Sequence, residues 1–227
     1  MKCNFTYKHY KEAINLGKKL GFSFYGMHDY LNAKPKKKFI VMRHDIDLSL
    51  KHALIMANAE KELGIKSTYF IRTRGIFNPF EGSELEIMKS ISKLGHEIGF
   101  HYEHNQNVLA NFKKNFVIEK IKFEALLNKK IFGAALHRAK NANDKSRPDK
   151  LNMVESFSSE LGLEYDAYSD IFLKQMKYIS DSSFRWREGC MCTHIKKEDK
   201  LCILTHPIWW SREATSLVSI IEGIFQN

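Results

Sequence analysis

Short apolar segments alternate with longer amphipathic segments along most of this chain. This alternation limits the possible folds more than any other feature of the sequence. Apolar runs such as "KFIVM" and "LCILT" are too short for buried helices and are typical of buried strands. Strands that alternate with helices usually form a parallel sheet whose faces are covered by those helices. The sequence therefore predicts an α/β fold.

The predicted elements follow one another in a regular order. We expect strands at residues 38–43, 67–71, 96–100, 131–136, 163–168 and 201–205. We expect helices over residues 7–20, 49–64, 83–95, 108–130 and 150–161, and from about residue 212. Local signals support two of the helix starts. Ser49 is a candidate N-cap, and Ser83 with Glu86 has the spacing of a capping box.

The length and composition of the chain fit one domain. Its 227 residues are 44% hydrophobic, which is enough for a substantial core. We treat residues 1–227 as a single domain, with the N-terminal helical region 1–37 as an appendage. The apolar runs are too short to cross a bilayer, and the N-terminus lacks the apolar stretch of a signal peptide. We therefore expect a cytoplasmic protein whose cysteines are reduced thiols.

The net charge of +10 has two possible meanings. A basic chain can bind nucleic acid or an anionic small molecule. Here the basic residues are mostly scattered lysines, and no known nucleic-acid motif accompanies them. We expect no nucleic-acid partner. An anionic substrate remains compatible with the charge.

Polar residues follow the predicted strands at the points where the strands end. Ligands of parallel α/β sheets bind beyond these carboxyl ends. Six of the ten histidines lie at these strands, together with paired acids, which favours a catalytic or metal-binding edge. The strand-end segments are Arg43-His44-Asp45-Ile46-Asp47, His101-Tyr102-Glu103-His104-Asn105, His137-Arg138 and His206-Pro207-Ile208-Trp209-Trp210.

Carboxylate and imidazole ligands together suit Zn²⁺, Mn²⁺, Fe²⁺ or Co²⁺. A catalytic metal site needs three protein ligands and an open position. Asp45 and Asp47 are two residues apart, so they would share one face of an extended strand. One could then bind a metal while the other accepts a proton from a water.

Several motifs stand in the order found in a known family. The segments "RHDID", "STYFI", "GHEIGFH", "HRA", "SDSSFRWR" and "LTHPIWW" span about residues 38–212. With them the chain resembles the polysaccharide deacetylases, which are the NodB-homology or family 4 carbohydrate esterases. The resemblance implies a distorted (β/α) barrel, with seven strands instead of eight. It also implies one divalent metal ion, with zinc favoured over manganese, iron, cobalt or nickel.

The resemblance also implies roles for individual residues. Asp45 would be the catalytic base and His206 the catalytic acid. Asp47 and His101 would be metal ligands. The family places a second metal histidine four residues after the first, but this chain has Asn105 there. Glu103 or His104 could replace it, and Glu103 is favoured if the strand continues in an extended form.

Other residues would bind or orient the substrate. Arg43 and His44 directly precede Asp45 and Asp47 in the sequence. The pair His137 and Arg138 resembles the arginine motif of the family, although it could instead cap a helix.

The loop that contains Asp181 and Arg185 could bind a sugar phosphate. Alternatively, these two residues could form an ion pair that braces the loop. Trp209 could wall the pocket, although a tryptophan pair such as Trp209 and Trp210 could equally belong to the core.

Cys190, Cys192 and His194 have the spacing of half a zinc site. No second half with a suitable spacing is evident, so reduced thiols on a strand are the preferred interpretation.

These features together predict a metal-dependent deacetylase of an N-acetylated, nucleotide- or lipid-linked sugar in surface-polysaccharide or O-antigen biosynthesis. The expected partner is a small, phosphate-linked carbohydrate. Two alternatives stay open. One is a catalytically inactive sugar-binding or assembly protein with the same fold, and the other is a hydrolase of a different C–N or acyl bond.

Overall fold

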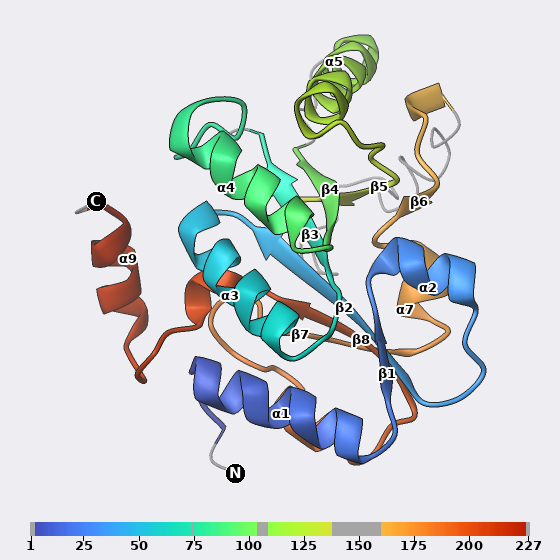
Figure 1. Ribbon diagram of the computed structural model, residues 1–227, viewed down its shortest axis with the longest axis vertical. Helices are drawn as coiled ribbons and strands as arrows, with labels where there is room; N and C mark the ends of the chain where they lie inside the picture. Colours follow the sequence, from blue (N-terminus) through green and yellow to red (C-terminus); the bar gives the residue numbers. More distant parts are fainter. Residues whose placement is uncertain (1–2, 74, 104–108, 138–159, 226–227) are drawn as a thin grey trace.

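The computed structural model describes residues 3–73, 75–103, 109–137 and 160–225. Its centre is one sheet of eight parallel strands (Figure 1). Seven of them form a continuous path in the order β6-β5-β4-β3-β2-β8-β7, and β1 pairs with the first half of β2. In the described part of the chain β6 and β7 stay unpaired edges, so the barrel is open. The predicted seven-stranded, distorted (β/α) barrel is confirmed, and β1 is an addition to it.

The strands are short, and most match the apolar runs of the sequence. Their bounds are β1 Ser23–Tyr25, β2 Phe39–Ile46, β3 Thr68–Arg72, β4 Glu97–Tyr102, β5 Gly133–Leu136, β6 Tyr165–Asp166, β7 Lys177–Ser180 and β8 Lys200–Thr205. The strands β2 and β4 run two or three residues further than expected. The polar residues that were expected to follow them therefore lie partly within them.

The helices cover the sheet and differ from the predictions in several places. Their bounds are α1 Tyr7–Lys19, α2 Met27–Ala33, α3 Leu50–Glu62, α4 Gly82–Lys93, α5 Leu109–Leu127, α7 Asp170–Leu173, α8 Met191–His194 and α9 Leu217–Phe225, with a 3-10 turn η2 at Pro207–Trp209. The predicted helix at 150–161 falls almost entirely outside the described residues. The last helix begins five residues later than the predicted start near residue 212.

One of the two predicted helix caps is confirmed and the other is wrong. The hydroxyl of Ser49 accepts a hydrogen bond from the backbone N–H of His52 at 3.3 Å and caps α3. Helix α4 instead begins after Glu81, which places Ser83 and Glu86 inside the helix. Gly82, the first residue of α4, has a φ of +59°, a conformation that glycine adopts readily. The N-cap residue is therefore Glu81, which makes no side-chain capping hydrogen bond.

The N-terminal region, which the sequence suggested as an appendage, packs into the core. Tyr10, Ala13 and Ile14 of α1 are fully buried and follow the spacing of one helical face. They pack in the same hydrophobic cluster as Ile40 of β2 and Leu201 of β8. The region also supplies β1 to the sheet.

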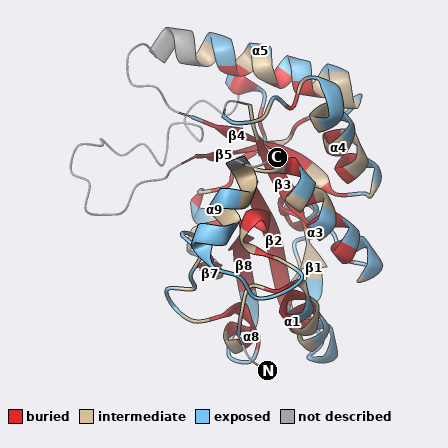
Figure 2. Cartoon of the chain, turned by 90° about the vertical axis from the view of Figure 1, so that its left-hand side faces the viewer, coloured by how far each residue is buried: buried red, intermediate tan, exposed pale blue. Residues whose placement is uncertain are grey.

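Strand β2 lies at the centre of the molecule, and each of its residues is buried (Figure 2). Because side chains alternate along a strand, Arg43 and Asp45 share one face while His44 and Ile46 share the other. This alternation directs Arg43 and Asp45 of the "RHDID" motif to one side of the sheet and His44 to the other.

In the described part of the chain, no helix is both long and apolar enough to cross a membrane.

Candidate active site

Four side chains meet at the carboxyl edge of the sheet. Asp47 follows β2, His101 lies near the end of β4, His137 follows β5 and His206 follows β8. The strand register explains why they meet. His101 is paired with Ala135 of β5, so the end of β5 lies beside the end of β4. The side chains that the sequence places at the strand ends therefore do come together at one edge of the sheet.

Asp47, His101 and His137 form a compact group that could hold a metal ion, which we call the rim triad. Oδ1 of Asp47 lies 3.1 Å from Nε2 of His101 and 3.6 Å from Nε2 of His137. The three candidate ligand atoms all lie within 4.8 Å of one another. Both imidazoles are buried, and the side chain of Asp47 is 21% exposed. Three ligands with access from solvent match the pattern of a catalytic metal site.

The hydrogen bonding of His101 supports a cation in this place. Its Nδ1 lies 3.0 Å from the backbone carbonyl of Ala135. Because a carbonyl only accepts, Nδ1 carries a proton, and Nε2 is the nitrogen that faces Asp47 and is free to bind a metal. Oδ1 of Asp47 is buried and makes no aligned hydrogen bond in the described structure. A positive ion would satisfy both facing atoms, so the residues present fit a divalent metal.

His137 is held by a carboxylate on its other nitrogen. Its Nδ1 lies 3.1 Å from Oε1 of Glu103, and Glu103 in turn accepts hydrogen bonds from Nε and Nη2 of Arg72. Burial lowers the pKa of His137 to about 4, although Asp47 acts in the opposite direction. The ring is therefore neutral at pH 7, as a metal ligand must be.

Glu103, expected from the sequence as the third ligand, thus lies on the side of His137 away from Asp47. It is 39% exposed and orients His137. His137, which the sequence placed among the orienting residues, is instead the third member of the rim triad. The other candidate for this ligand, His104, lies outside the described residues.

Asp45 is buried beside the rim triad and is held by Arg43. Nη2 of Arg43 donates to both carboxylate oxygens of Asp45, at 3.1 and 2.8 Å. Arg43 also donates to the backbone carbonyl of Ala167, and its guanidinium lies 4.5 Å from the ring centroid of Tyr168. Burial alone would raise the pKa of Asp45, but Arg43, assisted by neighbouring histidines, holds it below its usual value. Asp45 is therefore ionised at neutral pH.

His206 is fixed by a second carboxylate, Asp181. Oδ1 of Asp181 lies 2.7 Å from Nδ1 of His206, and both oxygens accept from the His206 backbone N–H. Nε1 of Trp210 also donates to Asp181, at 2.9 Å. Burial would lower the pKa of His206, but Asp181, with Asp45 and Asp47 adding to it, raises the pKa to about 9. The charged ring points Nε2 toward Asp47, 3.9 Å from its Oδ2.

Not all residues predicted for the site reach it. His44 faces the opposite side of β2, where its ring nitrogens lie 2.6 Å from the hydroxyl of Thr205 and 3.0 Å from the carboxylate of Glu60. Glu60 is fully buried and also accepts hydrogen bonds from Tyr10 and Ser67. His44 is therefore a structural residue of the core in this fold. Arg138 lies outside the described residues.

The loop after β7 contributes one carboxylate to the site. The alternative ion pair between Asp181 and Arg185 does not form, because Asp181 binds His206 and Trp210 while the Arg185 side chain is exposed. Trp209 is half-buried, with its ring centroid 6.3 Å from that of His206, so it is available as a wall beside His206. Trp210 belongs to the core.

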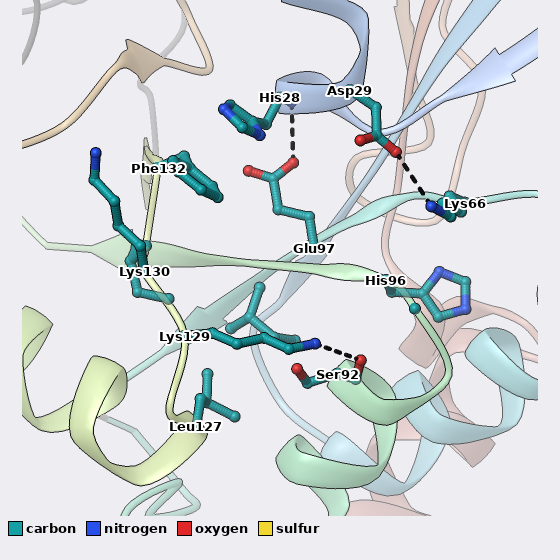
Figure 3. Close-up of a pocket in the computed structure, with 13 residues that line it drawn as sticks. His28, Asp29, Lys66, Ser92, His96, Glu97, Leu127, Lys129, Lys130 and Phe132 are labelled. Atoms are coloured by element: carbon teal, nitrogen blue, oxygen red, sulfur yellow. Dashed lines mark hydrogen bonds and ion pairs between the residues drawn. The ribbon is translucent and has the colours of Figure 1, made fainter. Parts of the chain in front are cut away.

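A cavity of about 260 Å³ lies at the opposite end of the sheet (Figure 3). Its polar groups bind one another. Glu97, at the start of β4, accepts from Thr68 at 2.5 Å and from Tyr165 at 2.6 Å. Lys129 donates to the backbone carbonyl of Ser92 at 3.0 Å. These groups are already paired, so we place the chemistry at the carboxyl edge.

Comparisons with known proteins give structural matches only. No protein-family model and no curated protein sequence matches the chain. A family 4 carbohydrate esterase from Bacillus anthracis has a TM-score of 0.52 at 12% identity, over 93% of this chain and 83% of that one. A chitin deacetylase from the fungal pathogen Colletotrichum lindemuthianum has a TM-score of 0.50 at 12% identity, over 82% of this chain and 80% of that one.

A further match is a mutant of a CE4 family pseudoenzyme with restored enzymatic activity. Its TM-score is 0.52 at 16% identity, over 85% of this chain and 64% of that one. Active and inactive proteins therefore share this architecture. The chain has the NodB-like fold of the CE4 polysaccharide deacetylases, and the resemblance predicted from its motifs is confirmed at the level of the fold.

Proposed function

We propose that this protein is a metal-dependent hydrolase that removes the acetyl group from an N-acetylated sugar. The observation that carries the proposal is the convergence of three functions at one edge. The rim triad offers a metal site, Asp45 offers an ionised carboxylate and His206 offers a charged imidazole. Amide hydrolysis needs a metal or an equivalent electrophile, a proton acceptor and a proton donor.

The rim triad would hold the metal through Asp47 Oδ1 and the Nε2 atoms of His101 and His137. When bound, a divalent ion supplies Lewis acidity, which polarises the acyl carbonyl and acidifies the attacking water. Ala135 and Glu103 fix the two imidazole rings through their Nδ1 atoms, so the Nε2 lone pairs stay directed at the site.

Asp45 would accept the proton of the attacking water. Its carboxylate lies within 3.9 Å of His101, beside the metal position, and Arg43 keeps it ionised. His206 would then donate a proton from Nε2 to the departing amine. Asp181 holds this ring in its charged form and in a fixed orientation, which is what a general acid needs at neutral pH.

We further propose a nucleotide- or lipid-linked sugar of surface-polysaccharide assembly as the substrate, with the protein acting in the cytoplasm. The net charge of +10 and the exposed Arg185 near the site favour an anionic ligand. A catalytically inactive sugar-binding protein is the rival, because the CE4 fold includes pseudoenzymes.

The test is an activity screen on metal-loaded protein. Free, nucleotide-linked and lipid-linked N-acetyl sugars are incubated with the protein, and acetate and free amine are measured by mass spectrometry. We expect acetate release that a chelator abolishes and added metal restores, with Asp45→Asn as the matched inactive control. If metal-loaded protein binds such a sugar but releases no acetate from any of them, the inactive sugar-binding alternative replaces the proposal.

A further inference from the structure

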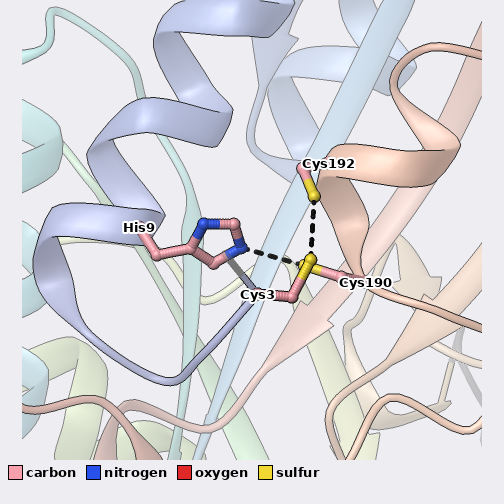
Figure 4. A group of neighbouring side chains, drawn as sticks. All are labelled: Cys3, His9, Cys190 and Cys192. Atoms are coloured by element: carbon pink, nitrogen blue, oxygen red, sulfur yellow. Dashed lines mark hydrogen bonds between the residues drawn. The ribbon is translucent and has the colours of Figure 1, made fainter. Parts of the chain in front are cut away.

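A second group of side chains that could hold a metal ion shares no residue with the rim triad (Figure 4). Cys3 precedes α1, His9 lies in α1, Cys190 is the N-cap of α8 and Cys192 lies in α8. We call these four residues the thiol cluster. Their candidate ligand atoms all lie within 4.8 Å of one another. The sequence interpretation of Cys190 and Cys192 as thiols on a strand is wrong, because they belong to a helix start.

The distances within the thiol cluster are those of four converging ligands. Nε2 of His9 lies 3.0 Å from Sγ of Cys190, and Sγ of Cys3 lies 3.4 Å from Sγ of Cys192. Zinc binds sulfur at about 2.3 Å in a tetrahedron, which places neighbouring sulfurs about 3.8 Å apart. The Cys3–Cys192 contact would open by about 0.4 Å to reach that spacing.

We propose that the thiol cluster binds a structural Zn²⁺ ion through the sulfurs of Cys3, Cys190 and Cys192 and Nε2 of His9. Three sulfurs and one imidazole complete a tetrahedral shell with no open position, which is the ligand set of structural zinc sites. The site stands independently of the proposed deacetylase function. It uses no residue of the carboxyl edge.

Burial and hydrogen bonding favour a metal over free thiols. His9, Cys190 and Cys192 are each less than 9% exposed. A buried thiolate needs a compensating positive charge, which a bound zinc ion supplies.

His9 also has the orientation of a coordinating histidine. Its Nδ1 is buried and has no hydrogen-bond partner in the described structure, and the nearest carboxylate, that of Glu12, lies 3.9 Å away. Metal-bound histidines usually direct their second nitrogen toward such a carboxylate. A disulfide between Cys3 and Cys192, whose sulfurs lie 3.4 Å apart, would use only two of the three sulfurs.

The proposed ion would connect the N-terminal segment with the C-terminal part of the chain. Cys3 and Cys192 are 189 residues apart in sequence. These two parts of the chain already meet through the Thr6–Ser211 bridge and the hydrogen bond from the Tyr7 N–H to the Ser211 carbonyl. Zinc would fix the N-terminal segment and α8 against the sheet, just before β8 leads to His206. The second half of this zinc site is therefore supplied by the N-terminus.

The test uses metal analysis and cobalt spectroscopy on protein purified under reducing conditions. Asp47→Ala serves as the background, because it removes the rim site. We expect about one zinc per chain in this background and none after Cys192→Ser is added. Cobalt substitution should give the thiolate-to-cobalt charge-transfer absorption, which the oxygen and nitrogen ligands of the rim triad cannot produce.

Two further variants make the test decisive. Cys3→Ser changes an exposed residue before the first helix, so it should remove the cobalt absorption while the circular dichroism spectrum stays native. Cys202→Ser changes the cysteine outside the cluster and should leave metal and absorption unchanged. The proposal fails if the Asp47→Ala protein binds no zinc, if its cobalt form lacks the thiolate absorption, or if the reduced protein mass is two hydrogens heavier than the purified one, which would reveal a disulfide.

Discussion

The two candidate metal sites of this chain differ in ligands, access and position. The rim triad uses one carboxylate and two imidazoles at the open edge of the sheet, and Asp47 remains 21% exposed. The thiol cluster uses three sulfurs and one imidazole where the N-terminus meets α8. An incomplete shell of harder ligands suits catalysis, whereas a closed shell of thiolates suits structure. The ligand set of each site therefore indicates its purpose.

The largest expected effect separates the two sites directly. Asp47→Ala removes the central ligand of the rim triad, so metal binding at the carboxyl edge should be lost and deacetylation should fall to background. The zinc of the thiol cluster should remain, because the clusters share no residue. Metal analysis of the wild-type and variant proteins gives the stoichiometry. A full metal complement in Asp47→Ala would assign the rim metal to other residues.

His206→Ala should reduce turnover by about 10²- to 10⁴-fold, the usual contribution of a placed general acid. The residue is no ligand of the rim triad, so the metal content should stay at the wild-type level. Steady-state kinetics on a confirmed substrate measures the loss. Near-normal turnover in His206→Ala would reduce this histidine to a structural partner of Asp181.

Glu103→Gln should weaken metal binding at the carboxyl edge by about 10- to 100-fold, the usual effect of losing the carboxylate that orients a ligating histidine. His137→Ala should weaken it further, because it removes a ligand itself. Competition with a chromogenic chelator gives both affinities. The opposite ranking, with Glu103→Gln the more damaging change, would return the third ligand to Glu103.

Asp181→Asn should change the pH dependence more than the maximal rate. The pKa of His206 is raised to about 9, mainly by Asp181 against the effect of burial, so the charged acid is present below that pH and lost above it. Loss of the Asp181 charge lowers this pKa, and the alkaline limb should move down by roughly 1 to 3 pH units. Rate profiles with the same bound metal make the comparison. An unmoved alkaline limb would mean that another group sets it.

Most of the carboxyl edge was predictable because it depends on strand ends. Asp45, Asp47, His101 and His206 follow apolar runs in the sequence, and parallel strands bring such ends together. The third candidate ligand was not predictable in this way. His137 joins the triad through the pairing of His101 with Ala135, a contact between β4 and β5 that local sequence does not encode.

Other parts of the fold lacked a sequence signal. Strand β1 has three residues, and in β7 only Ile179 is buried, so neither forms an apolar run. The thiol cluster was overlooked for a related reason. Cys190 and Cys192 were visible as half a site, but their partners Cys3 and His9 are close to them only because α1 packs beside α8.

The central claim is that Asp47, His101 and His137 bind a divalent ion at the carboxyl edge. A crystal structure of the zinc-loaded protein, with anomalous difference maps recorded on both sides of the zinc absorption edge, tests it most directly. The account predicts a peak bounded by Asp47 Oδ1 and the two Nε2 atoms, separate from any peak in the thiol cluster. A peak coordinated by Glu103 or His104 in place of His137, or no peak at the carboxyl edge of zinc-loaded protein, would contradict it.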